Sequence, residues 1–173
     1  MSNFSIYNID AWAASTNYTK NKIVIINNLY YYCLIPHISS NFVTDLAAGY
    51  WGGQISDNGE NKPYFFWKSS YRATVDNEPK IKKIQFGDGY TQRLNDGINN
   101  ILPSIDLTFE NIDLDETTSI LHFLEVRSGS ESFIYLPGAP RGILSRWVCE
   151  RWSDIQNFYN NYTITAKFDR SIT

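Results

Sequence analysis

The 173-residue chain has little of the material from which metal centres and most active sites are built. It contains two cysteines, Cys33 and Cys149, and two histidines, His37 and His122. No CxxC pair occurs, and Cys33 with His37 four residues on is too small a set to complete a metal site. With one histidine in a predicted helix and one after a strand-ending proline, no nucleophile has a base beside it. We therefore expect a protein that is not an enzyme, holds no metal or cofactor, and uses each cysteine as a small buried thiol.

Charge and long apolar runs are also scarce. Charged residues make up 19% of the chain and the net charge is −3, whereas a dedicated nucleic-acid-binding protein usually carries a basic face. No run approaches the ~20 apolar residues that a membrane helix needs, so membrane insertion is not expected. The first twelve residues have neither the basic nor the apolar region of a signal peptide. These absences predict a soluble protein made in a reducing cytoplasm.

Aromatic residues, by contrast, are abundant. They make up 16% of the chain, with 12 tyrosines and 5 tryptophans. Aromatic side chains favour strands, so the composition indicates a mainly β protein. They are also concentrated in protein interfaces and on sugar-binding faces. Composition alone therefore leaves open whether these aromatics form a core or a contact surface.

The first part of the chain, residues 4–51, has the pattern of a small β unit. Within it, residues 22–35 form two strands around Asn27 and Asn28, which tolerate the left-handed conformations of a two-residue turn. A unit of this size cannot bury both faces of its sheet, so one aromatic face is exposed or packs on a neighbour. Strand alternation gives the two faces: Tyr30, Tyr32 and Leu34 on one, and Leu29, Tyr31, Cys33 and Ile35 on the other.

Residues 52–63 are rich in glycine, asparagine and charge, which predicts a linker or surface loop and a domain boundary. The aromatic cluster at residues 64–67 is placed to pack across it. Beyond this point, apolar and polar residues alternate cleanly over residues 105–110, as in a half-buried antiparallel strand. Further strands are predicted at 132–136, 146–152 and 161–168, with a hairpin loop at 153–157 between the last two.

One helix is predicted in this second part. Asp113 fits an N-cap with Glu116 completing a capping box. Arg127 complements the C-terminal end of the helix dipole, and Gly129 ends the helix. His122 lies within it, and a surface or rim position is expected for this histidine.

Residues 79–93 predict a hairpin with a tight turn at FGDGY, where Gly87 and Gly89 supply positive backbone angles. The turn lacks the Lys and Ser/Thr of a phosphate-binding loop. Basic residues gather here, but they are too few for nucleic-acid binding and are expected at solvated strand positions. They are Lys80, Lys82, Lys83 and Arg93.

Residues 64–168 resemble the phage minor tail protein family of the lambda M type. The resemblance runs in order through about 105 residues. It rests on Phe66-Trp67-Lys68, Glu78-Pro79 with the basic strand, Phe86-Gly87-Asp88-Gly89-Tyr90 with Gln92-Arg93, the helix 116–124, the strand 133–136 with Pro137, and Val148-Cys149-Glu150-Arg151-Trp152.

The resemblance implies a structural virion protein at the tail tip of a long-tailed phage, assembled in the host cytoplasm. It implies an antiparallel β-sandwich or barrel of the tail-tube type with one flanking helix, over residues 64–173, preceded by the small β module, residues 1–60. The expected assembly is a ring, hexameric in such relatives, that joins the tail tube to the tip complex and lets DNA pass. The expected partners are other copies of the chain, the tail tube protein and the tip or hub proteins, with Lys80, Lys82, Lys83 and Arg93 at ring or lumen contacts.

Residues 4–51 more weakly resemble the small chitin-binding modules of the family 5/12 carbohydrate-binding type. The matching order is Trp12, Tyr18, Val24, Tyr31, Cys33, His37 and Trp51; Asn21-Lys22 departs from the usual Gly-Asp, and no proline precedes Trp51. An alternative function follows, a carbohydrate-binding protein that binds a surface polysaccharide through residues 1–60. That function requires an exposed, coplanar row of aromatics among Trp12, Tyr30, Tyr32 and Trp51. A module core built from Trp12, Tyr18 and Tyr31 explains the same residues without a sugar.

Overall fold

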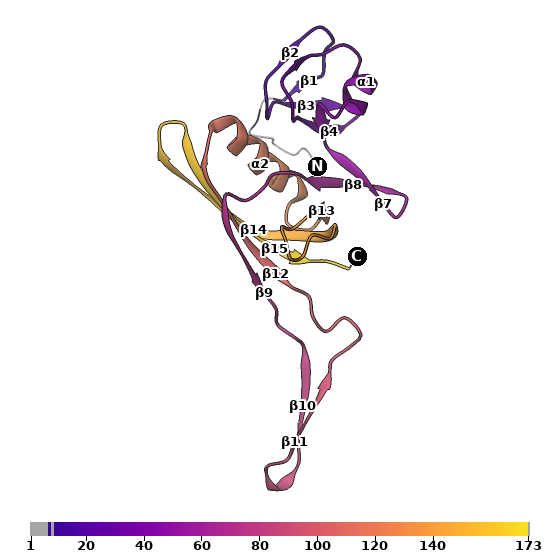
Figure 1. The fold of residues 1–173 in the computed structure, drawn as a ribbon, viewed down its shortest axis with the longest axis vertical. Coiled ribbons are helices and arrows are strands. Elements are labelled where there is room, and N and C mark those ends of the chain that lie inside the picture. The colour runs from indigo at the N-terminus through magenta and orange to yellow at the C-terminus, as the bar shows by residue number, and fades with distance from the viewer. Residues whose placement is uncertain (1–6, 8, 173) are drawn as a thin grey trace.

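The computed structural model describes residue 7 and residues 9–172, with the backbone alone for residues 71 and 72. The protein is mainly β, with a small aromatic module at one end, a large sheet flanked by helix α2 in the middle, and a two-stranded ribbon extending from the other end (Figure 1). This confirms the predicted fold class. The parts of the predicted module and domains that fall on residues 1–6, 8 and 173 lie outside the described residues.

The N-terminal module is built from short strands and one short helix. A four-stranded sheet has the order β1 (Asp10–Ala11), β3 (Ile23–Ile26), β4 (Leu29–Cys33), β6 (Trp51–Gly52). Beside it, β2 (Asn17–Tyr18) pairs with β5 (His37–Ile38), and α1 covers Phe42–Ala47. The sequence pattern did not predict α1, because six residues are too few to show a helical period. Its N-cap signal was present, since Asn41 Oδ1 accepts a hydrogen bond from Val43 N at 3.0 Å.

The β3–β4 hairpin confirms the predicted turn. Asn27 and Asn28 have φ angles of 50° and 62°, the left-handed values that a two-residue hairpin turn requires. The predicted alternation of β4 is confirmed as well, because its two faces enter two different apolar clusters. Tyr30 and Tyr32 pack in the main core, whereas Tyr31 and Cys33 pack in the module's own small core. The second aromatic face is therefore covered by the neighbouring domain.

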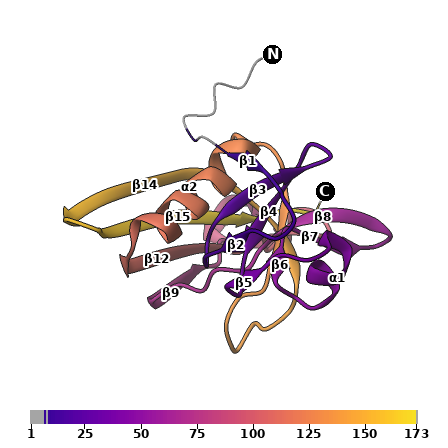
Figure 2. The same cartoon turned by 90° about the horizontal axis from the view of Figure 1, so that it is seen from above.

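A seven-stranded sheet forms the larger part of the protein. Its spatial order is β7 (Gln54–Asp57), β8 (Glu60–Phe65), β13 (Phe133–Tyr135), β14 (Ser145–Phe158), β15 (Asn161–Arg170), β12 (Ser104–Ile112), β9 (Tyr71–Asp76). The β8–β13 pair is parallel, and every other neighbouring pair is antiparallel. Helix α2 (Leu114–Arg127) lies across one face of this sheet, above β14 and β15 (Figure 2).

Two predicted loops are strands instead. Residues 52–63 form most of the β7–β8 hairpin, whose turn is made by Asn58 and Gly59 with φ angles of 51° and 85°. An edge hairpin needs few apolar residues, so its polar composition resembled that of a linker. Residues 153–157 continue β14, and the chain turns only at Tyr159 and Asn160. This end of the β14–β15 ribbon is exposed, so polar residues there carried no strand signal.

The main core lies between the sheet and α2. The alternation predicted for β12 and β15 is confirmed, since Ile105, Leu107, Phe109, Ile164 and Phe168 are all buried. The aromatic cluster after β8 does pack across the junction with the module: the Trp67 ring centroid lies 5.1 Å from that of Tyr32. The buried cluster comprises Ile23, Tyr32, Phe65, Trp67, Ile105, Leu107, Phe109, Ile112, Ile120, Phe123, Leu124, Phe133, Tyr135, Trp147, Cys149, Ile164, Ala166 and Phe168.

Helix α2 begins where the sequence predicted and ends at Arg127, two residues before Gly129. Asp113 Oδ1 accepts a hydrogen bond from Glu116 N at 2.8 Å, and Ser128, at φ 48°, takes the left-handed C-cap position just before Gly129. The expectation of a surface position for His122 was wrong. This side chain is 1% exposed, because the module covers the helix face that an isolated domain would leave open.

Replacing Asp113 with alanine is expected to lower the free energy of unfolding by about 1 kcal/mol, because the first turn of α2 loses its side-chain cap. Chemical denaturation measures this change. Asp115→Ala is the matched control, since Asp115 is an exposed first-turn carboxylate that makes no capping bond. The cap assignment is contradicted if both substitutions cost the same.

Candidate functional surfaces

The predicted hairpin is present as an arm that extends away from the body (Figure 1). We define the arm as residues 80–95, containing β10 (Ile81–Gln85) and β11 (Thr91–Asn95). The turn closes with a hydrogen bond from Phe86 N to Tyr90 O at 2.8 Å. Its left-handed residues are Asp88 and Gly89, with φ angles of 66° and 79°. The expectation that Gly87 supplies a positive angle was wrong, because Asp88, a residue that tolerates this region, occupies that place.

The register of the arm separates its side chains into two faces. Directly opposed residues of an antiparallel pair point to the same side. Ile84 opposes Gln92 and Lys82 opposes Leu94, so one face combines apolar side chains with Lys82. Phe86 and Tyr90 continue this apolar face at the turn, where their ring centroids are 5.9 Å apart. Only the basic residues of this hairpin were predicted from the sequence; two-residue alternation was the signal that would have found this stripe.

The second face of the arm is mostly polar and basic, with Ile81 as its one large apolar side chain. Lys83 lies directly opposite Arg93, and like charges in opposed positions are unfavourable. Both side chains are exposed, as are Lys80 and Lys82. Among the residues the structure describes, no ion pair joins any of these four to an acidic side chain. The structure thus brings the four predicted basic residues together on one projecting element, where none of them is in a described ion pair.

The four aromatics proposed as a sugar platform do not form an exposed row. Tyr32 is 1% exposed and Trp51 is 3% exposed, and they belong to separate clusters. Tyr30 packs edge-on against His122, with ring centroids 4.6 Å apart, and Trp12 packs similarly against Phe42 at 5.8 Å. The alternative, a module core that includes Tyr18, describes these contacts better. Carbohydrate binding through residues 1–60 stays a prediction.

One cluster in the module has the residue types of a catalytic triad without its geometry. His37 Nε2 lies 3.7 Å from Asp45 Oδ2, and Cys33 Sγ lies 3.9 Å from His37 Nδ1. However, His37 Nδ1 lies 2.8 Å from Ile35 O, so the imidazole donates to that carbonyl and does not take the thiol proton. Burial raises the pKa of the Cys33 thiol to about 11. Cys33 is therefore a packed thiol and not a nucleophile.

Cys149 is likewise buried, which raises its pKa to about 12. No group of three or more His, Cys, Asp or Glu side chains within residues 7 and 9–172 is placed to hold a metal ion. Nor does the described part of the chain contain a helix that is both long and apolar enough to span a membrane.

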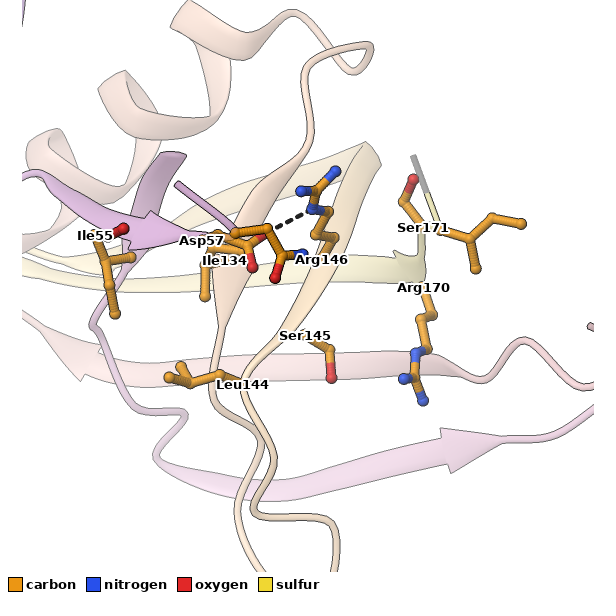
Figure 3. Close-up of a pocket in the computed structure, with 11 residues that line it drawn as sticks. Ile55, Asp57, Ile134, Leu144, Ser145, Arg146, Arg170 and Ser171 are labelled. Carbon is orange, nitrogen blue, oxygen red and sulfur yellow. Dashed lines mark hydrogen bonds and ion pairs between the residues drawn. The ribbon is translucent and has the colours of Figure 1, made fainter. Parts of the chain in front are cut away.

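A cavity of about 280 Å³ lies at the end of the sheet where β7 meets β14 and β15 (Figure 3). Its main polar contact is the ion pair between Arg146 Nε and Asp57 Oδ2 at 2.6 Å, which anchors the β7–β8 hairpin to β14. Ser145 Oγ donates to Ile143 O and so has no base beside it. The cavity therefore has a structural ion pair and no catalytic arrangement. The two residues of this ion pair are 89 positions apart in the sequence, and no sequence motif predicts a pair at that separation.

The sheet face turned away from α2 is polar. Thr108, Thr165 and Ser153 follow one another across β12, β15 and β14, and Ser153 Oγ lies 2.7 Å from Thr165 Oγ1. In the next row, Asp106 opposes Lys167, so charges of both signs are mixed. This face has the character of a solvated surface and not of a core.

The fold and these surfaces can be compared with known proteins. The model of the phage minor tail protein family matches residues 63–172, which is more than half of the chain. The chain belongs to the phage minor tail protein family. The match covers the seven-stranded sheet from within β8 onward, together with α2 and the arm; residues 1–62 lie outside it.

Two relatives of this minor tail protein are tail tip proteins. It is 33% identical over 89 residues to tail tip protein M of Escherichia phage lambda, covering 51% of this chain and 80% of the relative. It is 30% identical over 112 residues to tail tip protein M of Escherichia phage N15, covering 62% of this chain and 93% of the relative. Both relatives are matched over most of their own length, so the match leaves a substantial part of this longer chain without a counterpart.

Proposed function

We propose that this minor tail protein is a structural subunit of the distal tail of a long-tailed phage. In this proposal several copies, six by the family resemblance, form a closed ring that joins the tail tube to the tail-tip proteins. The observation that carries the proposal is the family match over residues 63–172. The chain acts by assembly, and catalysis plays no part.

The two open edges support self-association. Strand β7 bounds the seven-stranded sheet on one side and β9 bounds it on the other, so each has a row of backbone groups that no other strand of the described chain pairs with. Such edges are prone to uncontrolled pairing unless they are covered. A head-to-tail contact between copies covers both edges, and it produces a ring when its rotation closes.

The polar sheet face supports the proposal that DNA passes through the ring. In the proposed ring, the face bearing Thr108, Thr165 and Ser153 lines the lumen. This face presents hydroxyl groups and mixed charges, including Asp106 opposite Lys167, to a passing duplex. It therefore binds the DNA phosphates less tightly than a continuous basic surface would. The chain's net charge of −3 fits the same role.

We propose residues 64–173 as the ring domain and residues 1–60 as a module carried on it. Three contacts support a fixed attachment: Tyr32 OH lies 3.1 Å from His122 Nδ1, Ser119 Oγ donates to Asn21 O, and Tyr32 packs on Trp67. The partners in this arrangement are other copies, the tail tube protein and the tip proteins. The virion tail tip is the proposed location, after assembly in the host cytoplasm.

Imaging of assembled tails with this chain marked by a bound antibody fragment tests the proposal. We expect several copies around the tail axis at its distal end. A single copy per tail, or a position away from that end, would contradict it.

A further inference from the structure

We propose that the apolar face of the arm docks onto a second copy of this chain and so fastens neighbouring subunits together. The inference rests on the proposed ring and adds the surface that holds it and the identity of its partner. The docking face is defined by six residues: Lys80, Lys82, Ile84, Phe86, Tyr90 and Leu94.

The apolar side chains of the docking face are strongly exposed. The exposed fractions are 37% for Ile84, 48% for Phe86, 67% for Tyr90 and 44% for Leu94. Single exposed apolar residues are ordinary, but four on one face of a two-stranded ribbon form a continuous stripe. Such a stripe, with aromatic side chains at its tip, has the composition of an interface core.

Beyond its base, where Lys80 N donates a hydrogen bond to Asn100 O at 2.8 Å, the arm is not paired with the described strands of the main sheet. Strands β10 and β11 form a separate two-stranded sheet, and the arm projects away from the body (Figure 1). A hairpin of two strands is marginally stable in water unless a further element covers one face. The opposed pair Lys83 and Arg93 weakens it further. A partner that covers the apolar face supplies the missing layer.

Charge complementarity favours a copy of the same chain as that partner. The arm contains four of the chain's 15 basic residues and one of its 18 acidic residues, a net charge of +3. The chain's net charge of −3 therefore leaves −6 on the rest of the molecule. A basic arm and an acidic body are complementary between copies, and complementarity of this kind speeds encounter and fixes register. Because the donor and acceptor surfaces differ, the contact is head-to-tail, as ring closure requires.

The test is photo-cross-linking in assembled tails that carry the full chain with Tyr90 replaced by p-benzoylphenylalanine. We expect a covalent dimer of about 40 kDa, twice the 20.0 kDa chain. Mass spectrometry should assign both of the cross-linked peptides to this sequence. Cross-links to a different tail protein, or none to any protein, overturn the inference. Imaging of the same tails separates the two proposals: a ring without the cross-link refutes the arm contact alone, whereas the absence of a ring refutes the proposed function.

Two pairs of neighbouring residues provide matched variants, because adjacent strand positions point to opposite faces. Ile84→Asp and Lys82→Glu alter the docking face, and Gln85→Asp and Lys83→Glu place the same acidic side chains on the other face. We expect the first two to lower the cross-link yield about tenfold or more, since they remove apolar contact and charge attraction. We expect Gln85→Asp and Lys83→Glu to keep most of the cross-link yield. Lys83→Glu also relieves the repulsion with Arg93. Equal losses from both faces overturn the inference.

Discussion

Replacing Phe65 with alanine is expected to lower the free energy of unfolding by about 3–5 kcal/mol, the largest effect of any single substitution that we propose. Phe65 is 1% exposed and lies at the centre of the main core. Its ring is within 6.0 Å, centroid to centroid, of six other aromatic rings: Trp67, Phe109, Phe123, Phe133, Tyr135 and Phe168. These neighbours come from the sheet, from α2 and, for Trp67, from the connection after β8, so no single element can move to fill the space left by the ring.

Urea denaturation of the purified chain measures this loss. Phe158→Ala is the matched control, because Phe158 is the same residue type on the same sheet but is 66% exposed. We expect that variant to change the free energy of unfolding by less than about 0.5 kcal/mol. A loss below about 1 kcal/mol for Phe65→Ala would mean that the core is not packed as described.

Stability is also expected to fall as the pH drops from 6.5 to 4, with His122 contributing up to about 3 kcal/mol of the loss. Burial, together with a smaller contribution from the nearby positive charge of Arg127, lowers the pKa of His122 from 6.5 to about 4. The unfolded chain therefore binds this proton first. The contribution is fully present above pH 6.5, and it disappears as the pH falls toward the pKa of the folded state.

The surroundings of His122 explain why protonation is costly. Tyr30 and Tyr32 from β4 and Tyr7 from the N-terminal segment pack around the ring, and Arg127 lies on the same helix. None of these groups supplies a negative charge at neutral pH; burial raises the pKa of Tyr7 to about 12. Comparing urea denaturation of the wild type and His122→Gln at pH 7 and pH 4 isolates the effect, because both proteins share every carboxylate. Equal losses in the two proteins would contradict it.

The sequence predicted those parts of the fold that have a strong local signal. Asn27-Asn28 specified its turn, Asp113 specified the start of α2, and the alternation of β12 specified its buried face. The resemblance predicted the family and the order of elements from residue 64 onward. Where local signals were weak, the prediction was wrong: the β7–β8 hairpin and the far end of β14 are polar strands because no core covers them.

The surfaces were harder to predict, because they depend on how the two parts of the chain meet. His122 is buried only because β4 of the module covers it, and Tyr32 is buried for the same reason. A sequence pattern assigns such residues to a face but not to a partner. The basic residues of the arm were identified correctly as a group, yet the apolar stripe beside them became visible only with the register of β10 and β11.

The most direct test of the proposed ring is cryo-electron microscopy of the distal tail at a resolution that traces individual chains. The account predicts a closed ring of copies of this chain around the tail axis, with the polar face of β12, β14 and β15 toward the lumen. Assembled tails in which this chain is present as a monomer, or in which that sheet face is buried against another protein, would contradict it.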